Sequence, residues 1–231
     1  MAYSRPSALP ERPGEAALTR DMAGIGMNFA AAPNVDAPIE ETLVHASSLG
    51  MDDGDLRVLS VLTRWLDVHA VYINADRLVR CVSDHPSVRV RAYWAAVAHW
   101  LGRDRRFGRL TALHDGSALD LLPVGTAFQI ARRGEDERFV GSVLRVPADT
   151  LRRRDADVIS PESLARQHAG YRNRVLMGPT WRADVWTVRE RSPELSVAEV
   201  ARRAGCSFAT AWQVVQDFAL LRESERSAAS P

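Results

Sequence analysis

The stretch from Leu195 to Leu221 reads LSVAEVARRAGCSFATAWQVVQDFALL and decides how the last third of the chain is interpreted. Ser196 followed by Glu199 is a capping box, which marks the start of a helix. Gly205 is expected to end this short helix because glycine readily adopts a left-handed backbone. Ser207 can cap a longer second helix, whose apolar residues recur at spacings of three and four. The expected inward-facing residues are Val197, Val200, Ala201, Ala204, Cys206, Ala211, Val214, Val215, Phe218 and Leu221.

A supporting helix is predicted upstream, from Trp181 to near Ser192. A short helix, a glycine turn, a capping serine and a longer helix have the spacing of a helix-turn-helix. With the supporting helix, the segment from Thr180 to Leu221 resembles the three-helix core of bacterial winged helix-turn-helix regulators. The resemblance covers only a small part of the chain, and it assigns residues 171–231 to a helix-turn-helix domain.

The resemblance implies a DNA-binding regulatory protein and a set of site residues. The residues near the groove-facing surface would be Ser207, Phe208, Thr210, Trp212, Gln213 and Gln216. Gln213 would hydrogen-bond an adenine edge through its amide. The phosphate contacts would come from Arg182, Arg189, Arg202 and Arg203. The implied partner is double-stranded DNA, bound by a homodimer because half-sites are normally paired.

Two features depart from the family pattern and favour a different function. No basic residue lies between Ala204 and Leu221, although this helix would enter a negatively charged groove. Only ten polar and alanine-rich residues follow Leu221, which leaves no room for the usual wing. Phe208 and Trp212 would equally suit a protein surface. The alternative is therefore a protein-interaction module, as in a toxin–antitoxin or phage-defence pair.

The rest of the chain predicts a mainly α fold with one small antiparallel β-hairpin. Residues 1–37 are expected to be a flexible tail, since they are rich in Ala, Pro, Gly and Ser without a sustained period. Residues 38–122 are predicted to form a helical domain, with helices near 39–50, 55–68, 75–83 and 87–101. Alternating apolar residues at 124–130 and 139–145 predict the hairpin, which belongs to a hairpin and connector over 123–170.

The helices and hairpin of the N-terminal part also fit a second, degenerate winged helix. In that interpretation the helix from Ser87 to Leu101 recognises DNA, with Arg89, Arg91 and Tyr93 near its start. The hairpin tip, Arg132 and Arg133, would then be a basic wing. The alternative is a helical domain capped by a small sheet.

Composition narrows the function classes only weakly. The 231 residues carry 30 basic residues, all arginine, against 29 acids, for a net charge of +1. No apolar run approaches the ~20 residues that cross a bilayer, so no membrane partner is expected. The two cysteines lie far apart and form neither a disulfide framework nor a metal site, which favours the cytoplasm.

Catalytic motifs are missing from the sequence. It contains no phosphate-binding loop, nucleophile elbow, zinc-protease or dinucleotide motif. No metal or cofactor is expected, and the protein is not expected to be an enzyme. An enzyme that uses the region of His114 and Asp115 is the third possibility, and it would need a concave pocket that gathers further groups there.

Overall fold

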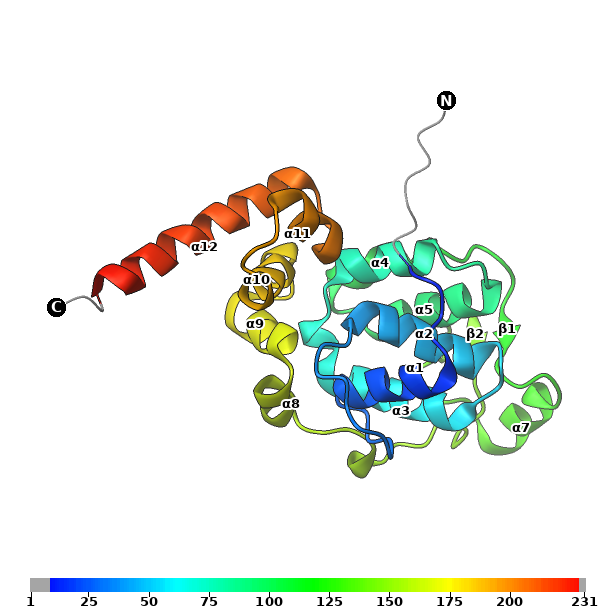
Figure 1. Cartoon of the computed structure of the whole chain (residues 1–231). Helices are drawn as coiled ribbons and strands as arrows, with labels where there is room; N and C mark the ends of the chain where they lie inside the picture. Colours follow the sequence, from blue (N-terminus) through cyan, green and yellow to red (C-terminus); the bar gives the residue numbers. More distant parts are fainter. Residues whose placement is uncertain (1–8, 229–231) are drawn as a thin grey trace.

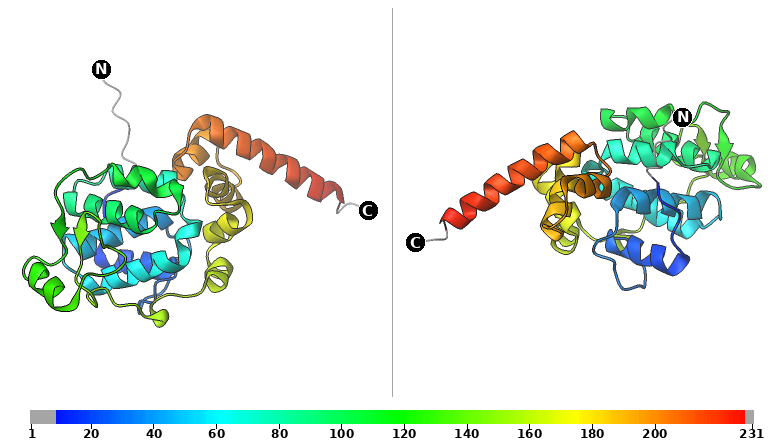
Figure 2. Two further views of the ribbon diagram at one scale, coloured as in Figure 1. Left: turned by 180° about the vertical axis from the view of Figure 1, so that it is seen from behind. Right: turned by 45° about the horizontal axis from the view of Figure 1, so that its top comes forward.

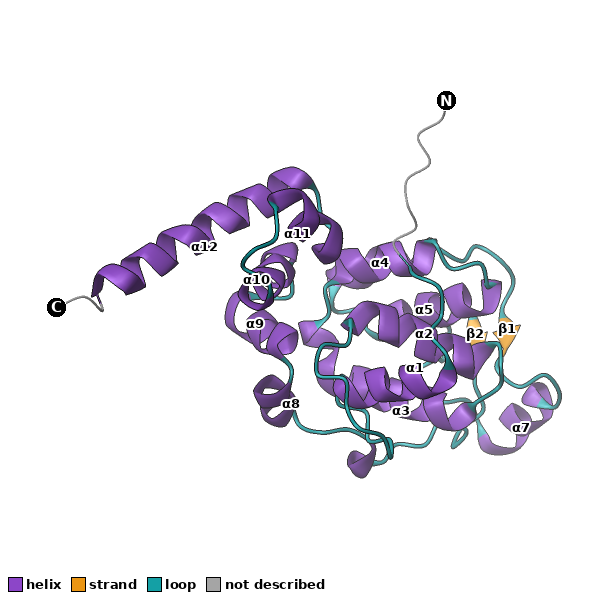
Figure 3. Ribbon diagram, in the orientation of Figure 1, coloured by secondary structure: helices purple, strands orange, loops and turns teal. Residues whose placement is uncertain are grey.

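The computed structural model describes the backbone of residues 9–228 and the side chains as far as Arg222. Helices dominate this part of the chain, which confirms the mainly α prediction (Figure 3). The first helices and short strands are α1 (Glu15–Gly24), α2 (Ile39–Met51), α3 (Leu56–His69), α4 (Ala75–Ser83), α5 (Val88–Trp100), α6 (Gly108–Thr111), β1 (Leu119–Asp120), α7 (Thr126–Arg133) and β2 (Leu144–Arg145). They are followed by α8 (Pro161–Gln167), α9 (Ala169–Met177), α10 (Trp181–Arg191), α11 (Val197–Ala204) and α12 (Phe208–Ala228). Three 3₁₀ turns lie at Ala70–Tyr72, Arg105–Phe107 and Asp155–Asp157.

The predicted helix starts in the N-terminal half are confirmed by their caps. The side chains of Asp55, Asn74 and Ser87 accept hydrogen bonds from the backbone N–H groups at the starts of α3, α4 and α5. Each cap satisfies an N–H group that the helix itself leaves without a partner. The helix starts could therefore be read locally from the sequence.

Helix α2 is the centre of the N-terminal body. It contacts α1, α3, α4 and α5, and nearly all of its residues are buried (Figure 1). The core around it contains Trp65 and Trp94, both without exposed surface. The indole of Trp65 donates to the backbone oxygen of Ile25 at 2.7 Å, and that of Trp94 donates to Ser47 Oγ at 3.0 Å. The two large side chains are therefore fixed by hydrogen bonds as well as by packing.

Part of the predicted tail is wrong, because α1 lies within residues 1–37. Leu18 and Met22, four residues apart on α1, are buried, as are Ile25 and Met27. They pack into the same core as α2, so this segment gains the burial that an isolated alanine-rich stretch lacks. Residues 1–8 of the expected tail lie outside the described residues.

The predicted antiparallel hairpin is also wrong. Its first expected strand is helix α7, bounded by Gly125 and Gly134, each with φ of +84°. The two short strands are parallel instead, pairing Leu119 with Leu144 and Asp120 with Arg145. The alternation of apolar residues did not reflect one buried face, because Phe128 on α7 is 71% exposed.

The upstream winged helix is excluded by the environment of α5. Its central residues are buried on all sides, including Tyr93, which lies 3.2 Å from the hydroxyl of Thr63. Arg89 donates to the backbone oxygens of Met51 and Leu121, and Arg91 donates to that of His85. The helix predicted to recognise DNA therefore lies inside the body, and residues 9–228 form no two-stranded hairpin that could act as its wing.

The C-terminal helices lie against one side of this body. Figure 2 shows α8, α9 and α10 following one another along the N-terminal body. Helix α12 extends away from the body and from these three helices. Helices α10, α11 and α12 contact one another and share a small core of Val185, Val200, Ala201, Ala204, Ala211, Val214 and Val215. This core is separate from that of the N-terminal body.

Candidate functional site

The start and end of α11 are fixed by local interactions that the sequence predicted. Ser196 Oγ accepts from the backbone N–H of Glu199 at 3.3 Å, and Glu199 Oε2 accepts from the backbone N–H of Ser196 at 2.9 Å. The hydrogen bonds from Ser196 lower the pKa of the Glu199 carboxyl below its usual range. Gly205, with φ of +72°, ends the helix in the left-handed conformation.

The turn after Gly205 leads directly into α12. Ser207 Oγ accepts from the backbone N–H of Thr210 at 3.1 Å and lies 2.8 Å from its hydroxyl. Cys206 is only half-buried against the small core. One face of α12 buries Ala211, Val214, Val215 and Phe218, as predicted, and the Phe218 ring meets Trp186 with centroids 4.8 Å apart. Leu221 was expected on this face but is 50% exposed. The far part of α12 extends beyond α10 and α11 (Figure 1).

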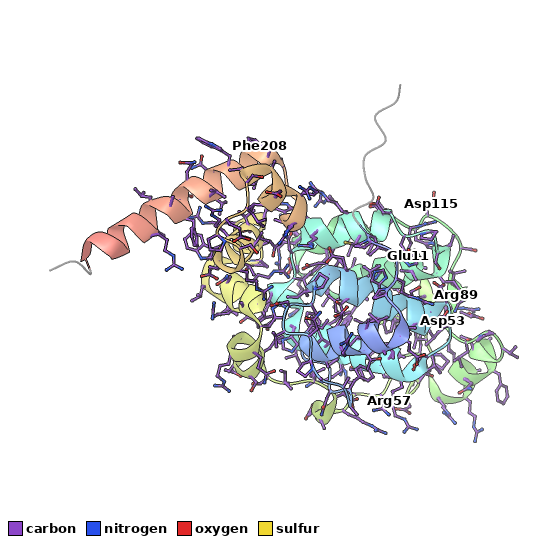
Figure 4. All side chains as sticks on the ribbon, viewed as in Figure 1. Glu11, Asp53, Arg57, Arg89, Asp115 and Phe208 are labelled. Atoms are coloured by element: carbon purple, nitrogen blue, oxygen red, sulfur yellow. The ribbon has the colours of Figure 1, made fainter. Side chains whose placement is uncertain are left out.

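The opposite face of α12 carries four of the six residues predicted to face the groove. Phe208 is 58% exposed and Trp212 49% exposed, and residues four apart lie on the same side of a helix. Figure 4 shows Phe208 at the outer side of the first turn of α12. Gln213 and Gln216 are exposed beside them, and Gln213 Nε2 lies 3.4 Å from Asp217 Oδ1. We refer to Phe208, Trp212, Gln213 and Gln216 as the α12 face.

The four arginines expected to contact phosphates have different environments. Arg182 forms an ion pair with Asp217 at 2.6 Å, and Arg189 donates to the backbone oxygen of Leu195 at 2.9 Å. Arg203 makes a long contact of 3.5 Å with Ser192 Oγ. The side chain of Arg202 is exposed and makes no hydrogen bond or ion pair with another described residue. Arg202 and Arg203 are thus the more accessible pair, while Arg182 and Arg189 brace the three helices.

The turn between α11 and α12 is anchored to the N-terminal body through α4. Arg80 Nη1 donates to the backbone oxygen of Gly205 at 2.6 Å, and Arg77 Nη1 donates to that of Ala204 at 3.4 Å. The guanidinium of Arg80 also stacks 4.7 Å above the ring of Trp181. Positive groups at a helix C-terminus are favoured by its partial negative charge. The position of α12 is therefore coupled to α4.

A buried ion cluster joins the same two parts of the molecule. Arg174 on α9 donates to both carboxylate oxygens of Glu40, at 2.6 and 2.8 Å, and to Asp184 at 2.8 Å. Asn74 donates to Glu40 from its backbone N–H and to Asp184 from its amide. Burial alone would lower the pKa of Arg174, but the charges of Asp184 and Glu40 outweigh it and raise that pKa above its usual value. Arg174 therefore keeps its charge within this buried contact.

The amino-acid sequence predicts neither of these two anchors. Arg80 and Gly205 are far apart in sequence, as are Glu40 and Arg174, so no local spacing connects them. A weak signal existed in Glu40, a charged residue inside the apolar stripe of a predicted helix. A charge at such a position requires a buried partner, but the sequence does not indicate which residue provides it.

His114 and Asp115 lie in the loop between α6 and β1. His114 is mostly buried, and its Nε2 lies 3.3 Å from the backbone oxygen of Ser117. Asp115 lies at the surface of the body (Figure 4). Among residues 9–222, whose side chains the structure describes, no group of three or more His, Cys, Asp or Glu side chains could hold a metal ion. No helix of the described chain has the length and apolar character to span a membrane.

We compared the chain with known proteins in three ways. No protein-family model, no curated protein and no solved structure matches the chain.

Proposed function

We propose that α10, α11 and α12 form a helix-turn-helix that binds double-stranded DNA, with α12 as the recognition helix. The observation that carries this proposal is the α12 face, which is exposed on a helix whose opposite side closes a separate three-helix core. The turn through Gly205 and the cap at Ser207 give α11 and α12 the spacing of this motif.

Within this proposal the site residues divide into two roles. Gln213 and Gln216 read base edges, because an amide presents a donor and an acceptor together. Arg202 and Arg203 contact phosphates and position the unit, aided by the hydroxyls of Ser207 and Thr210. Arg182 and Arg189 support the helices, since their guanidinium groups are engaged within the unit. A homodimer on paired half-sites would extend the short sequence that one helix reads.

The test is selection of duplexes from a random-sequence pool, followed by fluorescence anisotropy on the selected duplex and a scrambled one. We expect a preference for the selected duplex that persists at physiological salt. Gln213→Ala should reduce this preference at least tenfold, which corresponds to about 1–3 kcal/mol for a paired base contact. Gln167→Ala changes an exposed glutamine at the end of α8 and is the matched control. Equal affinity for both duplexes, falling steeply with salt, would contradict sequence recognition.

A second candidate function is supported by the aromatic part of the α12 face. Phe208 and Trp212 are exposed, and no basic residue lies between Ala204 and Leu221. Exposed aromatic side chains are enriched at protein–protein contacts. In this case the unit binds a protein partner, such as the other member of a toxin–antitoxin or phage-defence pair. Trp212→Ala would then abolish partner binding, while the wild-type protein would select no duplex at all.

A further inference from the structure

A cavity of about 710 Å³ lies in the N-terminal body, between residues 133–138 and 148–154. Its volume is within the range of small-molecule sites. Backbone hydrogen bonds connect the two walls, from Asp136 N to the Val146 oxygen at 2.8 Å and from Ala148 N to the Gly134 oxygen at 3.0 Å. Asp149, on the second wall, has φ of +62°, which non-glycine residues rarely adopt. The walls are therefore held in place before any ligand arrives.

Arg138 supplies a charged group to this cavity from a buried position. Its side chain is 4% exposed, and it donates to Asp136 at 2.8 and 2.5 Å and to the backbone oxygen of Leu151 at 2.7 Å. Its Nη1 atom is also buried and has no hydrogen-bond partner. A buried donor without an acceptor is costly and uncommon.

The rim of the cavity carries further arginines that are not neutralised. Arg133, Arg152 and Arg154 line it, are exposed, and form no ion pair with another described residue. Arg153 differs, because Glu137 and Asp67 hold it at 3.0 and 3.3 Å. The rim thus combines one fixed arginine with three that remain available to an anion.

A second cavity, of about 340 Å³, adjoins the first through shared residues. Arg152 and Arg154 line both, and the second is also lined by Leu56, Arg57 and Ser60 on α3, by Thr150 and by the carboxylate of Asp157. Arg57 lies at the lower edge of the body in Figure 4, and its guanidinium is 5.9 Å from the Phe29 ring centre. Together the two cavities are lined by several arginines, from Arg133 to Arg57, so a ligand with more than one anionic group would find a cation for each.

We propose that these two cavities, which we call the arginine pocket, bind a small phosphorylated compound. Guanidinium groups match phosphate oxygens in geometry and charge, and they remain protonated at any physiological pH. Glu135 and Asp149 also line the larger cavity. They accept hydrogen bonds from hydroxyl groups on the non-phosphate part of the ligand, as a nucleotide or sugar phosphate provides. This site is separate from the α12 face and does not depend on DNA binding.

Isothermal titration calorimetry with inorganic pyrophosphate, at constant ionic strength, tests the proposal. The wild-type protein should bind pyrophosphate, and the double variant Arg152→Ala/Arg154→Ala should bind it at least tenfold more weakly. Both substitutions are at exposed positions, so the fold should survive. The control is Arg103→Ala/Arg105→Ala, which removes two exposed arginines that line neither cavity and should leave binding unchanged.

Three outcomes would overturn the proposal. One is no detectable pyrophosphate binding at millimolar concentration, and another is equal binding by the Arg152/Arg154 variant and the wild type. The third is a duplex or single-stranded oligonucleotide that binds through Arg152 and Arg154 more tightly than pyrophosphate, which would make this a nucleic-acid surface. The Gln213→Ala variant should keep full pyrophosphate affinity, so a failure of the DNA proposal is distinguishable from a failure of this one.

Discussion

Arg80 on α4 donates to the backbone oxygen of Gly205 at 2.6 Å, so an N-terminal helix caps the turn that leads into α12. The same guanidinium stacks on Trp181, which begins α10. One side chain therefore contacts two of the three C-terminal helices and ties them to the body. The stability of these helices and the position of the α12 face therefore both depend on Arg80.

Replacing Arg80 should loosen the C-terminal helices. Arg80→Met removes a charged hydrogen bond and a cation–π contact but keeps an apolar chain of similar length. We expect a loss of about 1–2 kcal/mol in the free energy of unfolding, measured by urea denaturation. Hydrogen exchange should also rise in α11 and the first turn of α12. Arg105→Ala is the control and should change neither quantity; unchanged exchange in the Arg80 variant would show that this anchor is unimportant.

Replacing Arg174 should lower the free energy of unfolding far more than replacing Arg80 does. Arg174→Met leaves Glu40 and Asp184 buried with their principal cation gone. Breaking a buried ion pair on one side typically costs 3–5 kcal/mol, so we expect a loss of about that size in chemical denaturation. Arg174→Lys should rescue only part of it, because an ammonium group cannot make the same forked contacts.

The neighbouring Arg172 provides the matched control for this substitution. Its side chain is half exposed and lies 3.6 Å from Glu190. Arg172→Met should therefore cost less than about 1 kcal/mol, as exposed ion pairs do. If both variants lost similar stability, the buried cluster would not be the source of the effect.

Gly205→Ala should destabilise the protein by about 1 kcal/mol, because a residue with a Cβ is strained at a φ of +72°. The added Cβ would meet the Trp181 ring at 3.7 Å, an ordinary contact, so the cost is in the backbone rather than in a clash. Gly108→Ala is the opposite case, since Gly108 has a helical backbone and open space around it. Thermal denaturation should show that this second variant is unchanged or slightly stabilised.

Stability should fall between pH 6.5 and 4 because of buried histidines. His168 Nδ1 accepts from the backbone N–H of Tyr171 at 3.0 Å, and its Nε2 donates to the oxygen of Ala37 at 2.9 Å, so the ring is neutral. Burial lowers the pKa of His168 from 6.5 to about 4. As the pH falls, this histidine is protonated in the unfolded chain before it is protonated in the folded chain. Its contribution to stability is therefore full above pH 6.5 and is lost as the pH falls toward 4.

The size of this effect follows from the same pKa difference. A shift of this kind corresponds to about 3 kcal/mol between pH 7 and 4. Unfolding free energies measured by urea denaturation across this range give the slope for the wild type. In His168→Gln the slope should be smaller, although His69, whose pKa burial also lowers to about 4, would keep part of it. An unchanged slope would mean that His168 does not titrate differently on unfolding.

Local signals explain which elements the sequence predicted correctly. The capping groups Asp55, Asn74, Ser87 and Ser196 satisfy N–H groups within three residues of themselves, so each helix start is encoded where it occurs. The left-handed turn at Gly205 is equally local. These local features predict the helices of the candidate site and which of their faces are buried or exposed.

The errors arose where tertiary contacts decide the outcome. Leu18 and Met22 on α1 were placed in a tail because two apolar residues are a weak pattern, yet the core of α2 buries both. The alternating residues near Phe128 predicted a strand, but α7 lies at the surface and has no sheet face to bury them. The anchors at Arg80 and Arg174 join distant segments, which no local pattern can indicate.

The exposure of Trp212 has a practical consequence for spectroscopy. Of the six tryptophans, Trp65 and Trp94 are fully enclosed, three others are partly covered, and Trp212 alone has about half of its surface open to solvent. Acrylamide or iodide should therefore quench the red-shifted emission of Trp212 before that of the others. An event at the α12 face would register as protection from the quencher, so the protein carries its own optical reporter of what binds there, without a label.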